Sequence, residues 1–222
     1  MQRKLNDIDI MVVGDGINYA KKIAEALGIK KIVPFEKFGT ALIPGNKIQI
    51  EVASARSEEY LSNSRKPNKV TYTDLNGDLV RRDFTINAMA MHLSSKNFGD
   101  IIDLYNGKND IEKKILRTPL DPDETFSEDP LRMMRAAYFS SKLRFPIESE
   151  CIESIKRQAE RISIVSWERI RDEFIKILQT DKPSIGLTIL QDTGIMKIVF
   201  PEIDKMYGID QTAEWHHKEI FT

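Results

Sequence analysis

Hydrophobic positions at the start of the chain change their spacing in a way that predicts a strand followed by a helix. Residues 8–13 are mostly apolar and predict a strand. A helix is then expected from Asp15-Gly16 to Gly28, because apolar side chains recur there at intervals of three or four residues. Further strands are predicted at 38–43 and 47–53, on either side of a Pro-Gly-Asn turn.

The middle of the chain has fewer regular patterns. Residues 56–78 are polar and contain turn-forming residues, which predicts a long loop. Two apolar segments follow at 89–93 and 100–104, and they can pair as a hairpin. The first hundred residues therefore predict a mixed α/β region.

Beyond Gly107 the pattern becomes helical. Helices are expected from Pro130 to Phe139, after a cap at Ser149, after a cap at Ser166, and over 183–192 and 194–200, with Pro201 ending the last. The helix after Ser166 has a clear apolar stripe that we expect in the core: Trp167, Ile170, Phe174, Ile177 and Leu178. The predicted fold class is α+β, with a helical arm after the first region.

Composition restricts the setting in which the chain works. The 222 residues are 41% hydrophobic and 30% charged, with a net charge of −1, so no overall basic charge indicates nucleic acid. Cys151 is the single cysteine, which excludes an internal disulfide, and its helical spacing with neighbouring isoleucines places it beside a core. With no membrane-length apolar run and no signal sequence, we expect a soluble, cytoplasmic protein.

The segment from Arg81 to Ala90 carries the strongest chemical signal. Arg81 and Arg82 repel each other, and arginine donors match phosphate oxygens, so an anionic ligand is one interpretation and a surface salt-bridge cluster is the other. Asp83 or Asn87 could accept or share a ribose hydroxyl.

Carboxylates mark the start of the first predicted strand. Asp7 and Asp9 are two residues apart, so their side chains share one face, where they could hold Mg²⁺ or could simply be solvated. Glu51, on a neighbouring predicted strand, is a candidate third acid or a residue on the wet side of its strand.

A predicted helix start offers a way to read a nucleobase. Asp129 and Arg132 are three residues apart, which suits either a local ion pair or a joint donor and acceptor for a ligand. Cytosine and adenine both present a ring-nitrogen acceptor beside an amino donor, whereas guanine and uracil present the reverse order. One such pair could therefore select C and A without a nucleic-acid template.

The order of these motifs resembles the class II CCA-adding tRNA nucleotidyltransferases and the bacterial poly(A) polymerases, within the polymerase-β nucleotidyltransferase superfamily. Asp7-Ile8-Asp9, Arg81-Arg82-Asp83 and Glu128-Asp129-x-x-Arg132 occur in the family order. The segment from Asp103 to Asp110 resembles the family's head-to-neck hinge motif, and the segment from Glu168 to Glu173 resembles the motif that braces the base-reading helix.

The resemblance implies roles for individual residues. Asp7 and Asp9 would bind catalytic Mg²⁺, and Glu51 would complete the carboxylate set. The implied nucleotide-binding residues are Arg81, Arg82, Asp83, Asn87, Asp129, Arg132 and Arg135, with the two neighbouring arginines on the triphosphate and Asp83 on the ribose. The implied reaction adds C and A to the tRNA 3′ end from CTP and ATP with release of pyrophosphate. No membrane and no obligate protein partner is implied.

The resemblance also implies a domain layout: a nucleotidyltransferase head at 1–106, a helical neck with the base-reading helix at 107–181, and the start of a helical body at 182–222. A family Gly-Gly element has no counterpart before Asp7, and His216-His217 resembles the start of an HD-type domain. We therefore expect a chain truncated at both ends and poorly active alone.

Other functions remain open at this point. Within the same chemistry the alternatives are a CC-only, A-only or poly(A)-adding enzyme, although the basic signature usual in poly(A) polymerases is absent around residues 35–40 and favours tRNA maturation. Outside it, the alternatives are a non-catalytic RNA-binding protein and an HD-type phosphohydrolase.

Overall fold

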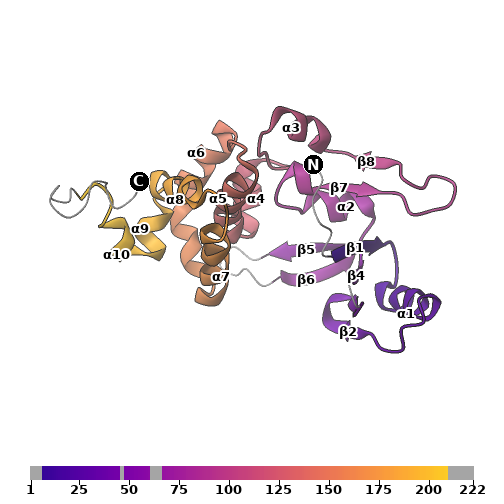
Figure 1. The fold of residues 1–222 in the computed structure, drawn as a ribbon. Helices are drawn as coiled ribbons and strands as arrows, with labels where there is room; N and C mark the ends of the chain where they lie inside the picture. Colours follow the sequence, from indigo (N-terminus) through magenta and orange to yellow (C-terminus); the bar gives the residue numbers. More distant parts are fainter. Residues whose placement is uncertain (1–6, 46–47, 61–66, 210–222) are drawn as a thin grey trace. The chain divides into compact units, whose positions relative to one another are not determined.

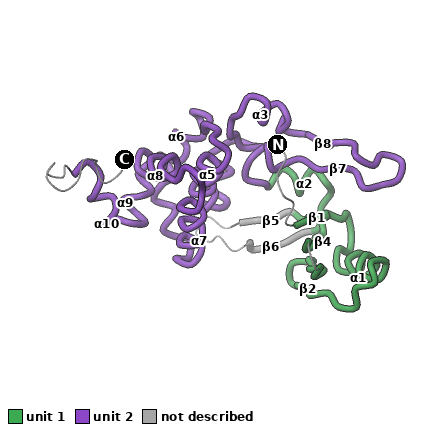
Figure 2. The backbone as a smooth tube through the Cα atoms, in the orientation of Figure 1, with its two compact units in different colours: residues 1–59, 67–81 green, residues 60–66, 82–222 purple. Residues whose placement is uncertain are grey.

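The computed structural model describes residues 7–45, 48–60 and 67–209, which form an α+β fold (Figure 1). The chain packs into two compact units. Unit 1 comprises residues 1–59 and 67–81, and unit 2 comprises residues 60–66 and 82–222 (Figure 2). This division by packing separates Arg81 from Arg82. The domain boundaries expected at residues 106 and 181 stay a prediction.

Unit 1 contains most of the strands. Its elements are β1 (Asp7–Val12), α1 (Gly16–Ala26), β2 (Val33–Phe35), the 3₁₀ turn η1 (Glu36–Phe38), β3 (Thr40–Ile43), β4 (Gln49–Ser54), β5 (Arg56–Tyr60), β6 (Pro67–Tyr72) and α2 (Leu75–Val80). Four of the strands form a mixed sheet in the order β1-β4-β3-β2, in which β1 runs parallel to β4 and the other pairs are antiparallel.

Helix α1 covers this sheet with small side chains. Ala20 and Ala24 are buried against Ala41 and Val52 of β3 and β4. Gly16 begins the helix so close to β4 that a Cβ there would lie 2.6 Å from the amide nitrogen of Ser54. The small residues at these positions therefore let the helix approach the sheet backbone.

The prediction of a loop over 56–78 is wrong. Strands β5 and β6 pair as a two-stranded sheet, and α2 follows with Asp74 as its N-cap, whose carboxylate accepts a hydrogen bond from the backbone N–H of Gly77. A pair of strands is held together by backbone hydrogen bonds and can form without alternating apolar and polar residues. The polar sequence therefore gave no sign of these two strands. The capping signal at Asp74 was present in the sequence.

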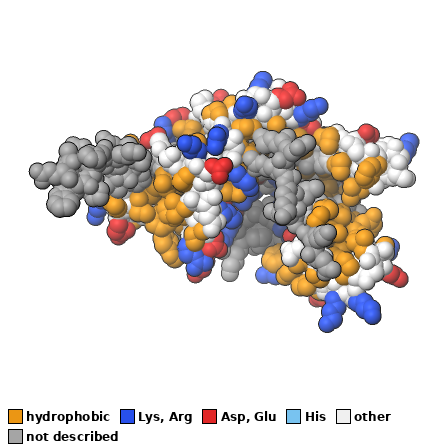
Figure 3. All heavy atoms as spheres, viewed as in Figure 1, with side chains coloured by type: hydrophobic (Ala, Val, Ile, Leu, Met, Phe, Trp, Pro, Cys, Tyr) orange, Lys and Arg blue, Asp and Glu red, His pale blue; other side chains and the backbone are white. Residues whose placement is uncertain are grey.

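Several large apolar side chains are exposed on unit 1, namely Val13, Val33, Phe35, Phe38 and Tyr72. Figure 3 shows hydrophobic side chains gathered on the visible face of this unit. They lie outside the core cluster between α1 and the sheet.

Unit 2 is mainly helical. Its elements are the 3₁₀ turn η2 (Thr85–Asn87), β7 (Met89–Met91), β8 (Ile101–Asp103), α3 (Gly107–Lys113), α4 (Pro122–Glu128), α5 (Leu131–Leu143), α6 (Ser149–Gln158), η3 (Ala159–Ile164), α7 (Trp167–Leu178), α8 (Pro183–Asp192), α9 (Ile195–Val199) and α10 (Pro201–Asp204). Strands β7 and β8 pair antiparallel, which confirms the predicted hairpin.

Helix α5 packs against both α7 and α8 in the core of unit 2. Met133 and Met134 of α5 are fully buried, as are Phe126 of α4 and Ile177 of α7. Cys151 is also fully buried in this core, as its spacing predicted, and burial raises the pKa of its thiol.

The predicted helices of unit 2 are present, with corrections at their ends. The N-cap position of α6 is Glu148 rather than Ser149, and Pro201 starts α10 instead of ending the helical region. In the stripe of α7, Trp167 and Leu178 are about half exposed, at 53% and 47%. The short helices α3 and α4 were not predicted, because seven-residue elements show less than two full turns of periodicity.

In the described part of the chain, no helix combines the length and apolarity needed to cross a bilayer.

Candidate active site

The predicted carboxylates of unit 1 lie on adjacent strands. Asp9 of β1 is the register partner of Glu51 on β4, and Asp7 is the partner of Gln49. Partnered residues on neighbouring strands share a face, and alternate residues of one strand do too. Asp7, Asp9 and Glu51 are therefore on one face of the sheet, and all three are exposed.

The donor set at this face suits a hard cation. Among the described residues, no group of three or more His, Cys, Asp or Glu side chains converges closely enough to hold a metal ion. Mg²⁺ is commonly bound by one or two protein carboxylates together with water and substrate phosphates. Asp7 and Asp9 supply that number of carboxylates on the end of one strand.

Arg81 belongs to unit 1, and its side chain is held by contacts with other residues of that unit. Its Nη2 donates to Asp78 Oδ1 at 2.6 Å, and its Nε donates to the carbonyl oxygen of Arg56 at 2.8 Å. Asp78 is buried, with its side chain 2% exposed, so this ion pair is only partly in water. The following residue, Arg82, belongs to unit 2 and is half-buried.

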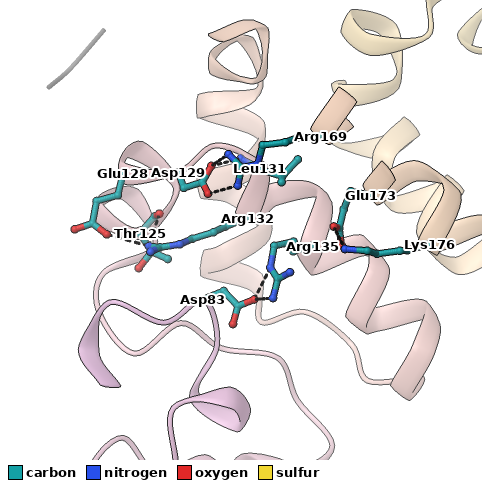
Figure 4. A network of polar contacts seen from close by, with 10 residues as sticks. All are labelled: Asp83, Thr125, Glu128, Asp129, Leu131, Arg132, Arg135, Arg169, Glu173 and Lys176. Carbon is teal, nitrogen blue, oxygen red and sulfur yellow. Dashed lines mark hydrogen bonds and ion pairs between the residues drawn. The ribbon is translucent and has the colours of Figure 1, made fainter. Parts of the chain in front are cut away.

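Asp83 is the centre of a compact polar cluster in unit 2 (Figure 4). Its Oδ2 accepts a hydrogen bond from Nε of Arg135 on α5 at 2.7 Å and forms an ion pair with Nη2 of the same guanidinium at 2.6 Å. Its Oδ1 accepts from the backbone N–H of Phe84 at 2.9 Å and from Nδ2 of Asn87 at 3.0 Å. The structure thus brings together three of the predicted site residues, Asp83, Asn87 and Arg135.

The surroundings of Arg135 keep its guanidinium charged. Burial lowers the pKa of Arg135, but the charge of Asp83, its hydrogen bond, and the charges of Glu173 and Asp129 outweigh that effect, so the pKa is raised. Arg135 also lies 5.3 Å from the centre of the Phe139 ring.

The segment that carries Asp83 and Asn87 is anchored to α3. Thr85 Oγ1 donates to Asp110 Oδ2 at 2.7 Å, and Asp110 is almost fully buried. Asp103 accepts from the N–H groups of Gly107 and Lys108 at the start of the same helix, at 2.7 and 2.8 Å. The Asp103-to-Asp110 motif therefore holds η2 in place through side-chain and backbone contacts. The hinge role implied for it stays a prediction.

Asp129 ends α4 and is held by α7. Its Oδ2 accepts from Arg169 Nη2 at 2.8 Å, and its Oδ1 accepts from Arg169 Nη1 at 3.4 Å and from the backbone N–H of Leu131 at 3.2 Å. Arg169, within the segment 168–173 that resembles a bracing motif, contacts the residue expected to read the base. The bracing role implied for this segment stays a prediction.

Arg132 has different partners from Asp129. Its Nη1 donates to Glu128 Oε2 at 2.9 Å and to the carbonyl oxygen of Thr125 at 3.0 Å. The residue is buried, with 9% of its surface exposed. The sequence suggested a possible ion pair between Asp129 and Arg132. In the structure Asp129 forms its ion pair with Arg169, and Arg132 forms one with Glu128.

Comparison with protein-family models identifies the family in which this chain belongs. The family model of the poly A polymerase head domain matches residues 1–117, which is more than half of the chain. The chain belongs to this family. A second model, described as a probable RNA and SrmB-binding site of polymerase A, matches residues 144–207.

Curated relatives of this poly A polymerase head-domain protein are named as nucleotide-adding enzymes. The CCA-adding enzyme of Lactobacillus helveticus is 38% identical over 178 residues, which cover 80% of this chain and 42% of that enzyme. The A-adding tRNA nucleotidyltransferase of Aquifex aeolicus is 32% identical over 224 residues, which cover 96% of this chain and 27% of that protein. The chain spans about half or less of the length of such relatives.

Solved structures of similar proteins share the fold. A tRNA nucleotidyltransferase complexed with a primer tRNA and an incoming ATP analogue matches 95% of this chain and 56% of its own, with a TM-score of 0.78 and 27% identity. The CCA-adding enzyme of Bacillus stearothermophilus in complex with CTP matches 87% of this chain and 45% of its own, with a TM-score of 0.71 and 30% identity.

Proposed function

We propose that this poly A polymerase head-domain protein adds C and A nucleotides to the 3′ end of tRNA, using CTP and ATP and releasing pyrophosphate. The observation that carries the proposal is the pair Asp129 and Arg132 on neighbouring helices of unit 2, where each side chain is held by its own bracing partner. The names of the relatives support the same substrate class.

The bracing of Asp129 leaves room for a ligand. A carboxylate has about four acceptor positions, and among the described residues Asp129 Oδ2 accepts only the hydrogen bond from Arg169 Nη2. The remaining acceptor position on Oδ2 suits the amino group of cytosine or adenine. Glu128 and Thr125 fix the guanidinium of Arg132, whose donors suit the ring nitrogen of the same bases.

We propose that Asp7 and Asp9 hold Mg²⁺ and that Glu51 assists from the next strand. Bound Mg²⁺ neutralises charge on the triphosphate and activates the attacking hydroxyl. The two aspartates suit Mg²⁺ binding because their side chains share one face of β1 and are exposed at its end. Arg81 and Arg82 bind phosphate oxygens in this scheme, with Arg81 oriented by Asp78.

A second candidate is the addition of A alone. The A-adding relative from Aquifex aeolicus is similar over 96% of this chain, so the chain's sequence is compatible with that narrower activity. Both candidates use the same carboxylates and differ in whether CTP is accepted.

The proposal is tested by incorporation of each of the four radiolabelled nucleotides into tRNA that lacks its CCA terminus, with protein made from the complete reading frame. Incorporation of CTP and then ATP, with UTP and GTP rejected, supports CCA addition. Incorporation of ATP only, onto tRNA ending in CC, supports the second candidate. Absence of incorporation from all four nucleotides overturns both.

A substitution at Arg132 tests the base-reading assignment within the same assay. Arg132→Ala removes one donor to C and A, so kcat/KM for both should fall relative to UTP and GTP by roughly tenfold. If Arg132 had only a structural role at the helix start, the substitution would lower kcat/KM for all four nucleotides together. Arg144→Ala is the control, because Arg144 is an exposed arginine just beyond the same helix.

A further inference from the structure

The four-stranded sheet of unit 1 has one face that its core does not use. Helix α1 packs on the face that carries Ala41 of β3 and Val52 of β4. Alternate residues of a strand point to opposite faces, so Leu42 and Glu51 lie on the face away from α1. Asp9 and Glu51 on this face are exposed, so it is open to a ligand.

A row of register partners crosses the open face from one edge of the sheet to the other. Asp9 of β1 pairs with Glu51 of β4. Glu51 pairs in turn with Leu42 of β3, and Leu42 pairs with Val33 of β2. Neighbouring strands lie about 4.8 Å apart, so three strand spacings separate Asp9 from Val33 by roughly 14 Å. The row therefore begins at the candidate metal-binding carboxylates and ends in apolar side chains.

The apolar end of this face carries exposed aromatic rings. Phe35 ends β2 on the same face as Val33, and 47% of its surface is exposed. Phe38 follows in η1 with 44% exposed. Neither ring belongs to the core cluster between α1 and the sheet. Large apolar side chains gathered on a surface in this way mark a place where a ligand binds.

Positive side chains accompany these rings. Nζ of Lys37 lies 5.8 Å from the centre of the Phe38 ring, and Cζ of Arg56 lies 5.7 Å from it. Nη1 of Arg56 also donates a hydrogen bond to the carbonyl oxygen of Phe38 at 3.3 Å. Proteins bind single-stranded nucleic acid by combining aromatic rings, on which bases stack, with cations that face the phosphates. A polyanion with flat rings therefore matches this end of the face.

The edge of β2 is poorly suited to pairing with a strand of another protein. It is the last strand in the sheet order, and it is only three residues long. Its central residue, Pro34, has no N–H to donate. Short edge strands that contain proline limit pairing with other chains. The exposed side chains, rather than the strand edge, are therefore the binding element.

We propose that Phe35 stacks on a base in the unpaired 3′ end of the RNA primer, upstream of the nucleotide that reacts. The inference rests on the proposed nucleotide transfer, which puts the reacting 3′-hydroxyl at the carboxylate end of the open face. A stacked strand advances about 3.4 Å per nucleotide, so roughly 14 Å across the sheet corresponds to about four nucleotides. The aromatic end of the face is thus within reach of a short unpaired end.

Binding of two RNAs tests this contact. The first is a tRNA that ends in CC, and the second is the same tRNA without its unpaired 3′ nucleotides. Protein from the complete reading frame is titrated with each RNA in the absence of nucleotide. Phe35→Ala should weaken binding of the first RNA roughly tenfold and leave the second unchanged, because only the first offers a base to the ring. An unchanged affinity for the first RNA, or an equal loss with both, overturns the proposal.

Further substitutions separate stacking from folding. Phe35→Trp keeps an aromatic face and should bind the first RNA like the wild type, whereas Phe35→Leu keeps only an apolar side chain and should bind it as weakly as Phe35→Ala. Tyr19→Ala is the matched control, because Tyr19 is a similarly exposed aromatic residue on α1, on the other side of the sheet. Wild-type affinity in Phe35→Leu would show an apolar contact without stacking and contradict the proposal.

Measuring binding without nucleotide separates failure of this inference from failure of the proposed transfer. A loss confined to the RNA with an unpaired end supports the role of Phe35 even if no nucleotide is incorporated. Incorporation of CTP and ATP by Phe35→Ala with an unchanged KM for tRNA supports the transfer and overturns this inference. Sedimentation of the protein alone tests for another occupant. A dimer that dissociates in Phe35→Ala would assign this face to a second copy of the chain and overturn the inference as well.

Discussion

Arg169 holds the carboxylate of Asp129 with both of its Nη atoms, at 2.8 and 3.4 Å, and so ties the start of α7 to the end of α4 (Figure 4). The two residues are 40 positions apart in the sequence. Their side chains are 36% and 18% exposed, so the pair is partly shielded from water. This contact fixes Asp129 before any ligand is present.

Removing this pair should destabilise unit 2. A double-mutant cycle of Arg169→Ala and Asp129→Ala should give a coupling of about 1 kcal/mol in the free energy of unfolding, since the pair is only partly exposed. Urea unfolding measures it. The exposed pair Arg171 and Asp172 is the control, with an expected coupling close to zero. Equal couplings for the two pairs would show that Arg169 does not brace Asp129.

Substitution of the carboxylates of β1 should remove activity and leave the fold intact. In Asp7→Asn or Asp9→Asn, nucleotide incorporation should fall by at least about a hundredfold, because a neutral amide is a poor Mg²⁺ ligand. Both residues are exposed, so the thermal unfolding midpoint should hardly change. Asp100→Asn, also exposed, is the control. Near-normal incorporation in both variants would remove the metal assignment.

Gly107 should tolerate no side chain. A Cβ at this position would lie 2.2 Å from the carbonyl oxygen of Thr85, and this obstacle is backbone, which cannot move aside as the end of a flexible side chain can. Gly107→Ala should therefore lower the free energy of unfolding by about 1–3 kcal/mol. Lys108→Ala, an exposed neighbour in the same helix, should change it little. Denaturant unfolding of the two variants decides the point, and a stable Gly107→Ala would contradict the close approach of α3 to η2.

Asp123 should make part of the stability depend on pH. Hydrogen bonds from Ser154 and Arg157 lower the pKa of Asp123 from its ordinary value of 3.8, with burial opposing them. Because the folded pKa is depressed, this stabilisation is fully present above 3.8 and is lost as the pH falls through the lower folded pKa.

The measurement is the difference in unfolding free energy between the wild type and Asp123→Asn as a function of pH. The wild type should be the more stable at neutral pH, and the difference should shrink below pH 3.8. Glu124→Gln changes an exposed carboxylate of the same helix and serves as the control. A difference that is independent of pH down to the acid transition would contradict the depressed pKa.

The sequence by itself determined what depends on neighbouring residues. The helical spacing at residues 17–27 predicted α1, and the apolar pattern at 183–192 predicted the bounds of α8. The shared face of Asp7 and Asp9 follows from strand geometry alone. The family followed from the order of short motifs, each of which is readable within about ten residues, and the family match confirmed it.

Only the tertiary structure decided which distant residues meet. Asp83 and Arg135 are 52 positions apart, and the register that sets Asp9 beside Glu51 depends on how β1 and β4 pair. Charge alone would allow an ion pair between Arg132 and Asp129. Because α7 packs against α5, the ion pair of Asp129 forms with Arg169 instead. Backbone pairing of β5 with β6 was likewise invisible in a polar sequence. Such contacts depend on long-range packing, which local spacing does not encode.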